Sequence, residues 1–227
     1  MPDFDVQKFL FALSYALIPG IFAVTLHEVA HGWAAKQLGD TTAYMLGRLS
    51  LNPLKHIDPI GTILVPFAMY LFVGTPFGWA KPVPVSFRNL RQPRRDMVLV
   101  AAAGPAANFA MALGWALIGA LVIGVVGRES VLSYGLPYWI ISNCQAGIIF
   151  NVSLGVFNLV PIPPLDGGRV LSGLLPLKAA RVFERIEPFG LMILILLLVA
   201  APQVLIFVIE PIFNPLVRFY SNLAGLA

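Results

Sequence analysis

The feature that most constrains this chain is an apolar run, residues 9–26, that leads directly into His27-Glu28-Val29-Ala30-His31. About 20 consecutive apolar residues suffice for a helix to cross a bilayer. An ionisable side chain near the bilayer core costs roughly 2.5–3.5 kcal/mol on insertion scales, so such a residue indicates a functional site. We therefore expect a polar site at the end of a membrane-embedded helix.

The five-residue motif itself predicts a metal site. Two histidines four residues apart lie on one face of a helix, where both imidazoles can bind a single Zn²⁺. Glu28 lies between them and is free to act as general base on a zinc-activated water. His27 and His31 are thus candidate zinc ligands, and Glu28 is the candidate catalytic residue.

Composition supports a membrane protein independently of the motif. Hydrophobic residues make up 58% of the chain, charged residues only 11%, and the mean hydropathy is +0.83. This composition excludes an ordinary soluble domain, and no basic face of the kind that binds nucleic acid is visible. We expect one membrane-embedded domain over residues 1–227, with a core at about 8–190 and a C-terminal segment and tail at 189–227. The sequence sets no oligomeric state.

Further apolar segments predict an all-α polytopic fold with about 4–6 membrane segments. The additional full-length candidates are 97–126, 138–160 and 189–209, the last of them interrupted by Pro202, and a shorter one covers 60–73. The tail from residue 210 is amphipathic and could lie at the membrane interface or return through the membrane.

The distribution of Lys and Arg predicts the topology. If residues 60–73 dip into the membrane without crossing, twelve of the 15 Lys and Arg residues fall on one side. The positive-inside rule favours this arrangement, so we expect loops 36–96 and 162–188 in the cytosol and the N-terminus and 127–137 outside. The chain is then a multi-pass protein of the plasma or inner membrane, with its active site nearer the cytosolic face.

A catalytic zinc site needs a third protein ligand. Asp166 is the favoured candidate because it ends an apolar segment and precedes two glycines that allow close backbone approach. The alternative is that Asp166 only caps the next helix. His56 and Asp58 remain weaker candidates, since both lie in a segment that reads as an exposed loop.

Three separated motifs together resemble a known family. They are His27-Glu28-x-x-His31, Gly104-Pro105-x-x-Asn108, and Asn158-x-x-Pro161 leading to Leu165-Asp166-Gly167. This combination resembles the site-2 protease family of intramembrane zinc metalloproteases. Residues 52–61 and 78–85 resemble a compact prokaryotic branch of that family, so we expect no PDZ or appended regulatory domain.

The resemblance implies an activity and a site. It implies that His27, His31 and Asp166 bind one Zn²⁺ per chain, with Glu28 as the base of a zinc metalloendopeptidase. It also implies that the substrates are transmembrane proteins, cleaved in or next to their membrane segments by regulated intramembrane proteolysis.

Two further predictions concern substrate contacts. Asn108 and Asn158 are candidate oxyanion donors or supporting residues, and ordinary interhelical hydrogen bonding is the alternative for both. Val83 and Val85, beside two prolines, suit an edge strand that holds an extended substrate, with residues 42–51 pairing beside it as a small hairpin near the cytosolic face. The alternative is a Pro-rich interfacial loop.

Two other functions remain open at this point. The first is a zinc protease that acts on exposed loops or termini of its substrates. The second is a membrane metal transporter or metal-handling protein in which the histidines line a pathway, although the corresponding repeated halves typical of transporters are not visible.

Overall fold

The computed structural model describes residues 6–73 and 78–226, and the regular structure in these residues is helical. The long helices are α1 (Val6–Gln37), α4 (Pro93–Val126), α5 (Leu136–Asn158) and α9 (Pro202–Leu223). The shorter ones are α2 (Thr42–Met45), α3 (Val65–Val73), α6 (Asp166–Leu174), α7 (Leu177–Glu184) and α8 (Gly190–Ala200). A π-helical turn, Pro59–Leu64, leads into α3, and short 3₁₀ turns cover Pro53–His56, Phe87–Asn89, Glu129–Val131 and Glu187–Phe189.

Four helices are long and apolar enough to cross a membrane: α1 from Leu10, α4, α5 and α9. Their bounds agree with three of the apolar runs seen in the sequence. The structure therefore confirms an all-α polytopic membrane protein.

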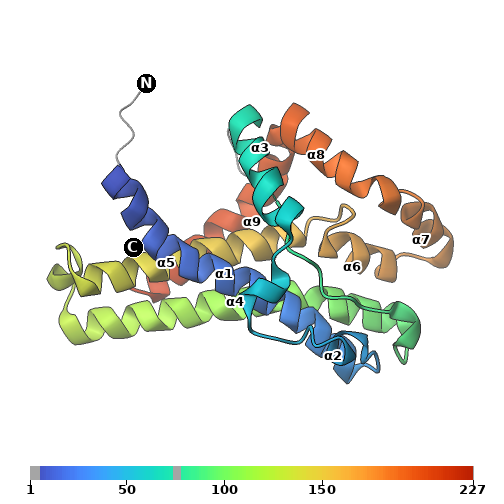
Figure 1. Cartoon of the computed structure of the whole chain (residues 1–227), viewed down its shortest axis with the longest axis horizontal. Helices are drawn as coiled ribbons and strands as arrows, with labels where there is room; N and C mark the ends of the chain where they lie inside the picture. The colour runs from blue at the N-terminus through green and yellow to red at the C-terminus, as the bar shows by residue number, and fades with distance from the viewer. Residues whose placement is uncertain (1–5, 74–77, 227) are drawn as a thin grey trace.

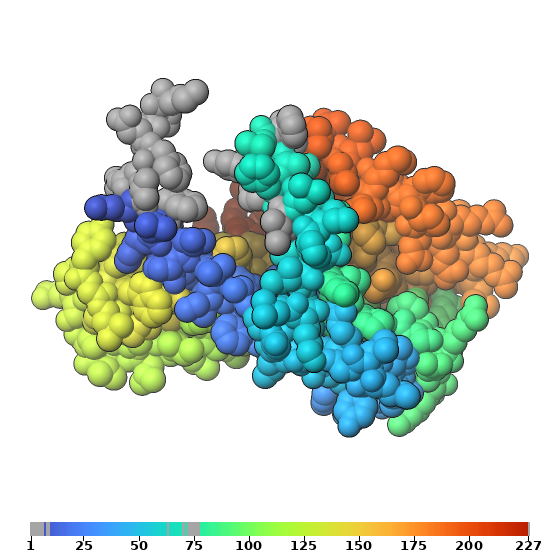
Figure 2. Space-filling view, in the orientation of Figure 1, coloured from blue at the N-terminus to red at the C-terminus, as the bar shows by residue number. Residues whose placement is uncertain are grey.

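Helices α1, α4 and α5 pack together in one bundle (Figure 1). In Figure 1, α4 and α5 lie side by side along the long axis, and α1 crosses them. An apolar core joins α4 and α5 to α9 and its C-cap residue through mostly small and branched side chains, with one tyrosine: Ala112, Ala116, Ile148, Val152, Val156, Tyr220 and Ala224. The space-filling view shows α3 and α8 forming the upper part of the same face (Figure 2).

The outer surfaces of the long helices are apolar. Large exposed side chains on α4 include Leu113, Leu117, Ile118, Leu121 and Val125. A soluble protein rarely exposes a contiguous apolar surface of this kind. This surface fits contact with lipid.

The predicted span at 189–209 is wrong in its bounds. Apolarity continues through this segment, but the helix breaks at Ala201, and Pro202 begins α9. Proline suits the first turn of a helix, where its missing N–H is not needed. The 11 residues of α8 extend only about 16 Å, short of the roughly 30 Å hydrocarbon core. The long helix is instead α9, which contains much of the predicted tail.

The predicted hairpin is also wrong within the described residues. Residues 42–45 form α2 rather than a strand, and Val83 and Val85 lie in an extended segment without a strand partner. Pro82 and Pro84 lack backbone donors, which prevents a regular ladder here. The Lys81 N–H donates instead to the His56 carbonyl, and the Val83 N–H donates to the Glu28 side chain.

The residues just before and just after the short apolar segment that contains α3 are hydrogen-bonded to each other. The Trp79 N–H donates to the Gly61 carbonyl at 2.9 Å, and the Thr62 hydroxyl donates to the Trp79 carbonyl at 2.9 Å. Asp58 caps the π-helical turn by accepting from the backbone N–H groups of Ile60 and Gly61. The chain before α3, at Gly61, and the chain after it, at Trp79, are therefore held together, and they are called the two ends of the α3 excursion.

Candidate metal centre

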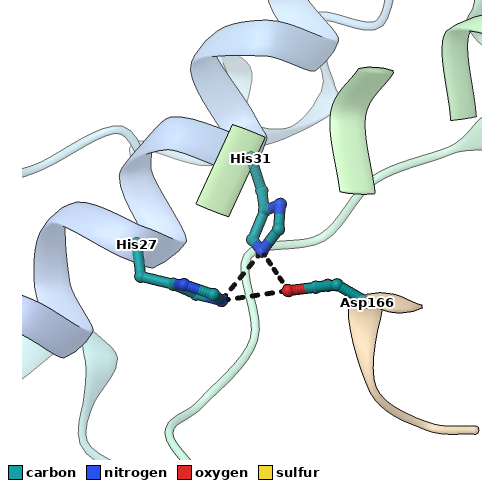
Figure 3. A group of neighbouring side chains, drawn as sticks. All are labelled: His27, His31 and Asp166. Atoms are coloured by element: carbon teal, nitrogen blue, oxygen red, sulfur yellow. Dashed lines mark hydrogen bonds and ion pairs between the residues drawn. The ribbon is translucent and has the colours of Figure 1, made fainter. Parts of the chain in front are cut away.

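Three side chains from two distant parts of the chain converge on one point (Figure 3). His27 and His31 project from α1, and Asp166 is the first residue of α6. The two Nε2 atoms lie 3.0 Å apart, and each is 3.2 Å from Asp166 Oδ2. All three residues are buried. Among the described residues, this is the group of His, Cys, Asp and Glu side chains arranged to hold a metal ion.

The histidine rings are oriented by hydrogen bonds on their far nitrogens. His27 Nδ1 lies 2.6 Å from Asn108 Oδ1, and His31 Nδ1 lies 2.7 Å from the Val100 carbonyl. Both partners are acceptors, so each Nδ1 carries the proton and donates it. The Nε2 lone pairs are left facing one another and Asp166, which is the tautomer a metal site requires.

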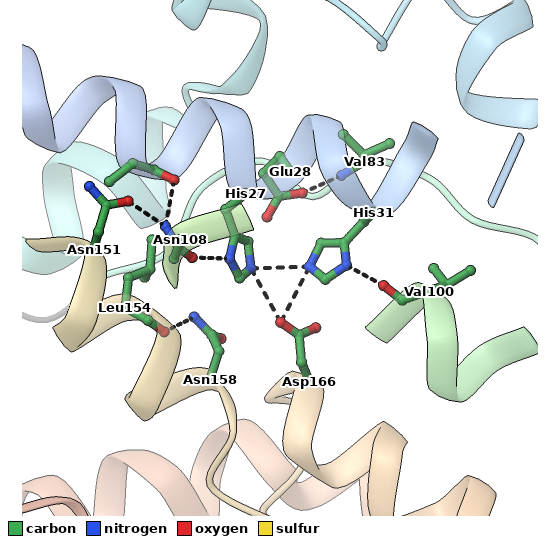
Figure 4. A network of polar contacts seen from close by, with 11 residues as sticks. His27, Glu28, His31, Val83, Val100, Asn108, Asn151, Leu154, Asn158 and Asp166 are labelled. Atoms are coloured by element: carbon green, nitrogen blue, oxygen red, sulfur yellow. Dashed lines mark hydrogen bonds and ion pairs between the residues drawn. The ribbon is translucent and has the colours of Figure 1, made fainter. Parts of the chain in front are cut away.

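Asn108 is held by a second asparagine that sequence reasoning missed (Figure 4). The Asn108 amide donates to the Ala23 carbonyl at 3.1 Å and to Asn151 Oδ1 at 2.9 Å, and Asn151 donates to the Gly147 carbonyl. Both amide hydrogens of Asn108 are thereby used, so it supports His27 rather than serving as a free donor. The available signal was that Asn151 lies seven residues before Asn158, on the same face of one apolar helix.

Asn158 occupies a different place. Its amide donates to the Leu154 carbonyl one turn earlier at 2.9 Å, and it does not join the Asn108 network. Figure 4 shows it on α5, beside the Asn108 network and the cluster.

Gly104 provides the room for both imidazoles. A Cβ at this position would lie under 3.0 Å from ring atoms of His27 and of His31. Gly104 precedes Asn108 by one turn of α4, so the same helix face accommodates the rings and orients one of them. This explains the spacing of Gly104-Pro105-x-x-Asn108.

Asp166 does not act as a helix cap. It follows the N-cap residue Leu165, whose side chain makes no capping bond, and Asp166 Oδ2 is buried without a hydrogen-bond donor of its own. Asp166 Oδ2 instead faces the Nε2 atoms of His27 and His31, each 3.2 Å away.

The donor set fits zinc. Ligand atoms about 2.0–2.2 Å from a tetrahedral zinc lie roughly 3.3–3.6 Å from one another, close to the 3.0–3.2 Å separations here. Two imidazole lone pairs facing a carboxylate oxygen repel one another unless a cation or protons lie between them. Three protein ligands would leave one of the four positions of a tetrahedral zinc for water, as in catalytic zinc sites.

Glu28 lies beside the cluster and is held by backbone. The Val83 N–H donates to Glu28 Oε2 at 2.7 Å. In Figure 4 the other carboxylate oxygen is directed away from Val83, toward the side of the three clustered residues. The Val83 side chain packs into a notch at Gly32, where a Cβ would lie under 3.0 Å from it.

The other proposed third ligands lie elsewhere. His56 is buried, contrary to the expectation of an exposed loop, and its Nε2 donates to the Ser50 carbonyl at 2.9 Å. Asp58 is used in capping the turn before α3. The structure brings Asp166, and neither His56 nor Asp58, to the two histidines.

Comparisons with known proteins agree with this chemistry. The profile of Peptidase family M50 matches residues 138–201. YwhC of Bacillus subtilis (strain 168), named as a zinc metalloprotease, is 38% identical over 190 residues, covering 82% of this chain and 81% of its own length. Rip2 of Mycolicibacterium smegmatis, also named as a zinc metalloprotease, is 29% identical over 79% of this chain and 64% of its own length.

More distant similarity reaches the protease RseP of Yersinia pestis, which is 30% identical over 52% of this chain and 28% of its own length. No solved structure matches. The similarity to YwhC extends across four fifths of both proteins, and the four apolar helices and the buried His-His-Asp cluster fit the same class. The chain therefore belongs to peptidase family M50, the site-2 protease family of membrane zinc metalloproteases.

Proposed function

We propose that this zinc metalloprotease cleaves peptide bonds in or next to transmembrane segments of other membrane proteins. The observation that carries the proposal is the position of the cluster: His27 and His31 lie within a helix long and apolar enough to span the membrane. A site so placed is reached from within or beside the bilayer. Residues 1–227 would act as one membrane-embedded domain.

The roles of the residues follow from their geometry. His27, His31 and Asp166 would hold the zinc, which lowers the pKa of a bound water to about 7 and polarises a carbonyl. Glu28 would accept the proton of the attacking water and deliver it to the leaving nitrogen. Its bond to the Val83 N–H leaves one carboxylate oxygen for this proton transfer.

The structure supports different roles for the two asparagines. Asn108 would fix the His27 ring, because its donors are already used. Asn158 uses one amide hydrogen on its own helix. Its second hydrogen makes it the better oxyanion donor of the pair.

We expect the Asn108→Ala variant to bind zinc about 10–100-fold more weakly, because the His27 ring loses the partner that fixes its tautomer. Zinc affinity would be measured by competition with a chelator of known affinity. The matched control is Asn143→Ala, which removes a buried asparagine on α5 that donates to the Trp139 carbonyl of its own helix. Equal zinc affinity in the two variants would contradict the supporting role of Asn108.

The topology proposal places the loops before α4 and after α5 in the cytosol. The closed ends of the α3 excursion at Gly61 and Trp79 support a segment that enters and leaves on one side. A segment that crossed the membrane would separate these ends by the bilayer thickness. The cluster would then lie nearer the cytosolic face of the plasma or inner membrane.

Cysteine labelling in intact cells tests this topology. The one native cysteine, Cys144, is buried and gives little background. We expect Ser50→Cys and Arg88→Cys to react with an impermeant maleimide only after the membrane is opened. Ser133→Cys in the loop before α5 should react in intact cells. Reaction of positions 50 and 88 from opposite sides would show that the α3 segment crosses.

The proposed function is tested with purified protein in liposomes that contain single-span reporter proteins. We expect cleavage that a chelator abolishes and Zn²⁺ restores. We also expect faster cleavage of a reporter whose helix carries a central Gly-Pro pair, because helical amides must be released before hydrolysis. A preference for a soluble peptide, or zinc flux across the liposome without cleavage, would favour the two alternative functions.

A further inference from the structure

Asp40 is a fully buried carboxylate outside the metal cluster, just beyond the end of α1. Its Oδ1 accepts hydrogen bonds from the Thr42 N–H, the Thr42 hydroxyl and the Asn89 amide. Its Oδ2 accepts from the Ser86 N–H at 2.7 Å. The preceding Gly39 has a positive φ of 113°, which turns the chain toward residue 89.

The charge state of Asp40 fits this anchoring role. Burial acts to raise the pKa of Asp40, but the hydrogen bonds from Thr42, Asn89 and Ser86 outweigh burial and hold the pKa below its ordinary value. Asp40 is therefore an anion at neutral pH, and its four hydrogen bonds are charge-assisted.

The segment that Asp40 holds, residues 79–86, is called the strap below. At one end, Arg48 donates to the Lys81 carbonyl at 3.1 Å, and the Lys81 N–H donates to the His56 carbonyl at 2.9 Å. At the other end, Asp40 holds Ser86. Between these anchors, the Val83 N–H holds Glu28 at 2.7 Å. The strap is thus fixed on both sides of the residue that contacts Glu28.

Asp40 is too far away to act on the cluster directly. It lies 12 residues beyond Glu28, or about 18 Å along a helix of that length. The path between the two carboxylates runs through only four residues of the strap, from Ser86 to Val83. A glutamate side chain has several rotatable bonds, so a fixed N–H donor is what keeps its carboxylate in one orientation.

We propose that Asp40 is a positioning residue that anchors the strap so that the Val83 N–H holds the Glu28 carboxylate in place. This inference rests on the proposed role of Glu28 as the general base. The Pro82-Val83-Pro84 stretch then serves to orient Glu28.

The first test is Asp40→Asn in the full-length protein. An asparagine side chain has one accepting oxygen and one donating NH₂ group. The NH₂ group therefore meets the donor of Ser86 or the donors of Thr42 and Asn89, and those hydrogen bonds are lost. We expect kcat for reporter cleavage to fall about 10–100-fold, as small misplacements of catalytic groups do, with KM and bound zinc unchanged. Hydrogen exchange at the amides of Val83, Val85 and Ser86 should become faster.

Two further variants separate positioning from general damage. Val83→Pro removes the N–H that holds Glu28, so adding Asp40→Asn to it should lower kcat little further. Asp96→Asn is the matched control, because Asp96 is also buried and accepts a backbone N–H, from Gln92 at 2.8 Å, but has no bond to the strap. It should leave kcat and exchange at residues 83–86 unchanged.

Several results would overturn the proposal. They are loss of zinc in Asp40→Asn, unchanged exchange at residues 83–86, full additivity with Val83→Pro, or an equal effect of Asp96→Asn. The exchange measurement needs no substrate and reports on Asp40 alone. If the wild-type protein cleaved no reporter, the proposed function would fail, whereas unchanged exchange in Asp40→Asn would reject the anchoring role itself.

Discussion

We expect Glu28→Gln to abolish cleavage of a single-span reporter while leaving one zinc per chain. The glutamine side chain keeps the size of glutamate, and its amide oxygen can still accept the Val83 N–H. It cannot take a proton from water, and a general base contributes about 10²–10⁴-fold to a rate. Cleavage should therefore fall by at least that factor. Elemental analysis and a reporter assay on the same preparation would measure both properties.

The matched control for this prediction is Glu129→Gln, which removes a carboxylate from the exposed turn between α4 and α5. It should leave both zinc content and cleavage unchanged. Full activity of Glu28→Gln would assign the base to another residue. Loss of zinc in Glu28→Gln would mean that the carboxylate helps to hold the metal, and its role as a free base would have to be abandoned.

Local sequence patterns predicted three of the four long helices and two members of the cluster. Helices α1, α4 and α5 follow from uninterrupted apolar runs, because their length alone satisfies the bilayer. His27 and His31 lie on one turn of one helix, so their spacing predicts that they meet. Asp166 is 135 residues beyond His31, yet the prolines and glycines around it indicated an unusual helix start.

Other features depend on which elements pack together, and the sequence pattern did not indicate them. Asn151 matters because α5 lies against α4, where Asn108 is 43 residues away in the chain. Val83 suits a strand by composition, but the nearest acceptor to its N–H is the Glu28 side chain. Pro202 marked an interruption in the last apolar run, but the pattern did not indicate that a long helix would begin there.

The second large effect is expected at Gly104. On propensity alone, alanine is more favourable than glycine inside a helix by about 1 kcal/mol. Here, however, the added Cβ would lie under 3.0 Å from both imidazoles. The rings have little freedom to retreat, because Asn108 and the Val100 carbonyl hold their far nitrogens. We therefore expect Gly104→Ala to lose bound zinc and, with it, cleavage.

The same helix provides the control for Gly104→Ala. Gly114 lies on α4 with nothing within 4 Å of the position its Cβ would take. Gly114→Ala should retain zinc and cleavage, and thermal unfolding should show equal or greater stability. A folded Gly104→Ala with full zinc would mean that the metal ligands do not lie against α4 as the structure places them. Loss of zinc in Gly104→Ala alone would tie metal binding to the one residue on α4 whose missing side chain leaves room for both rings.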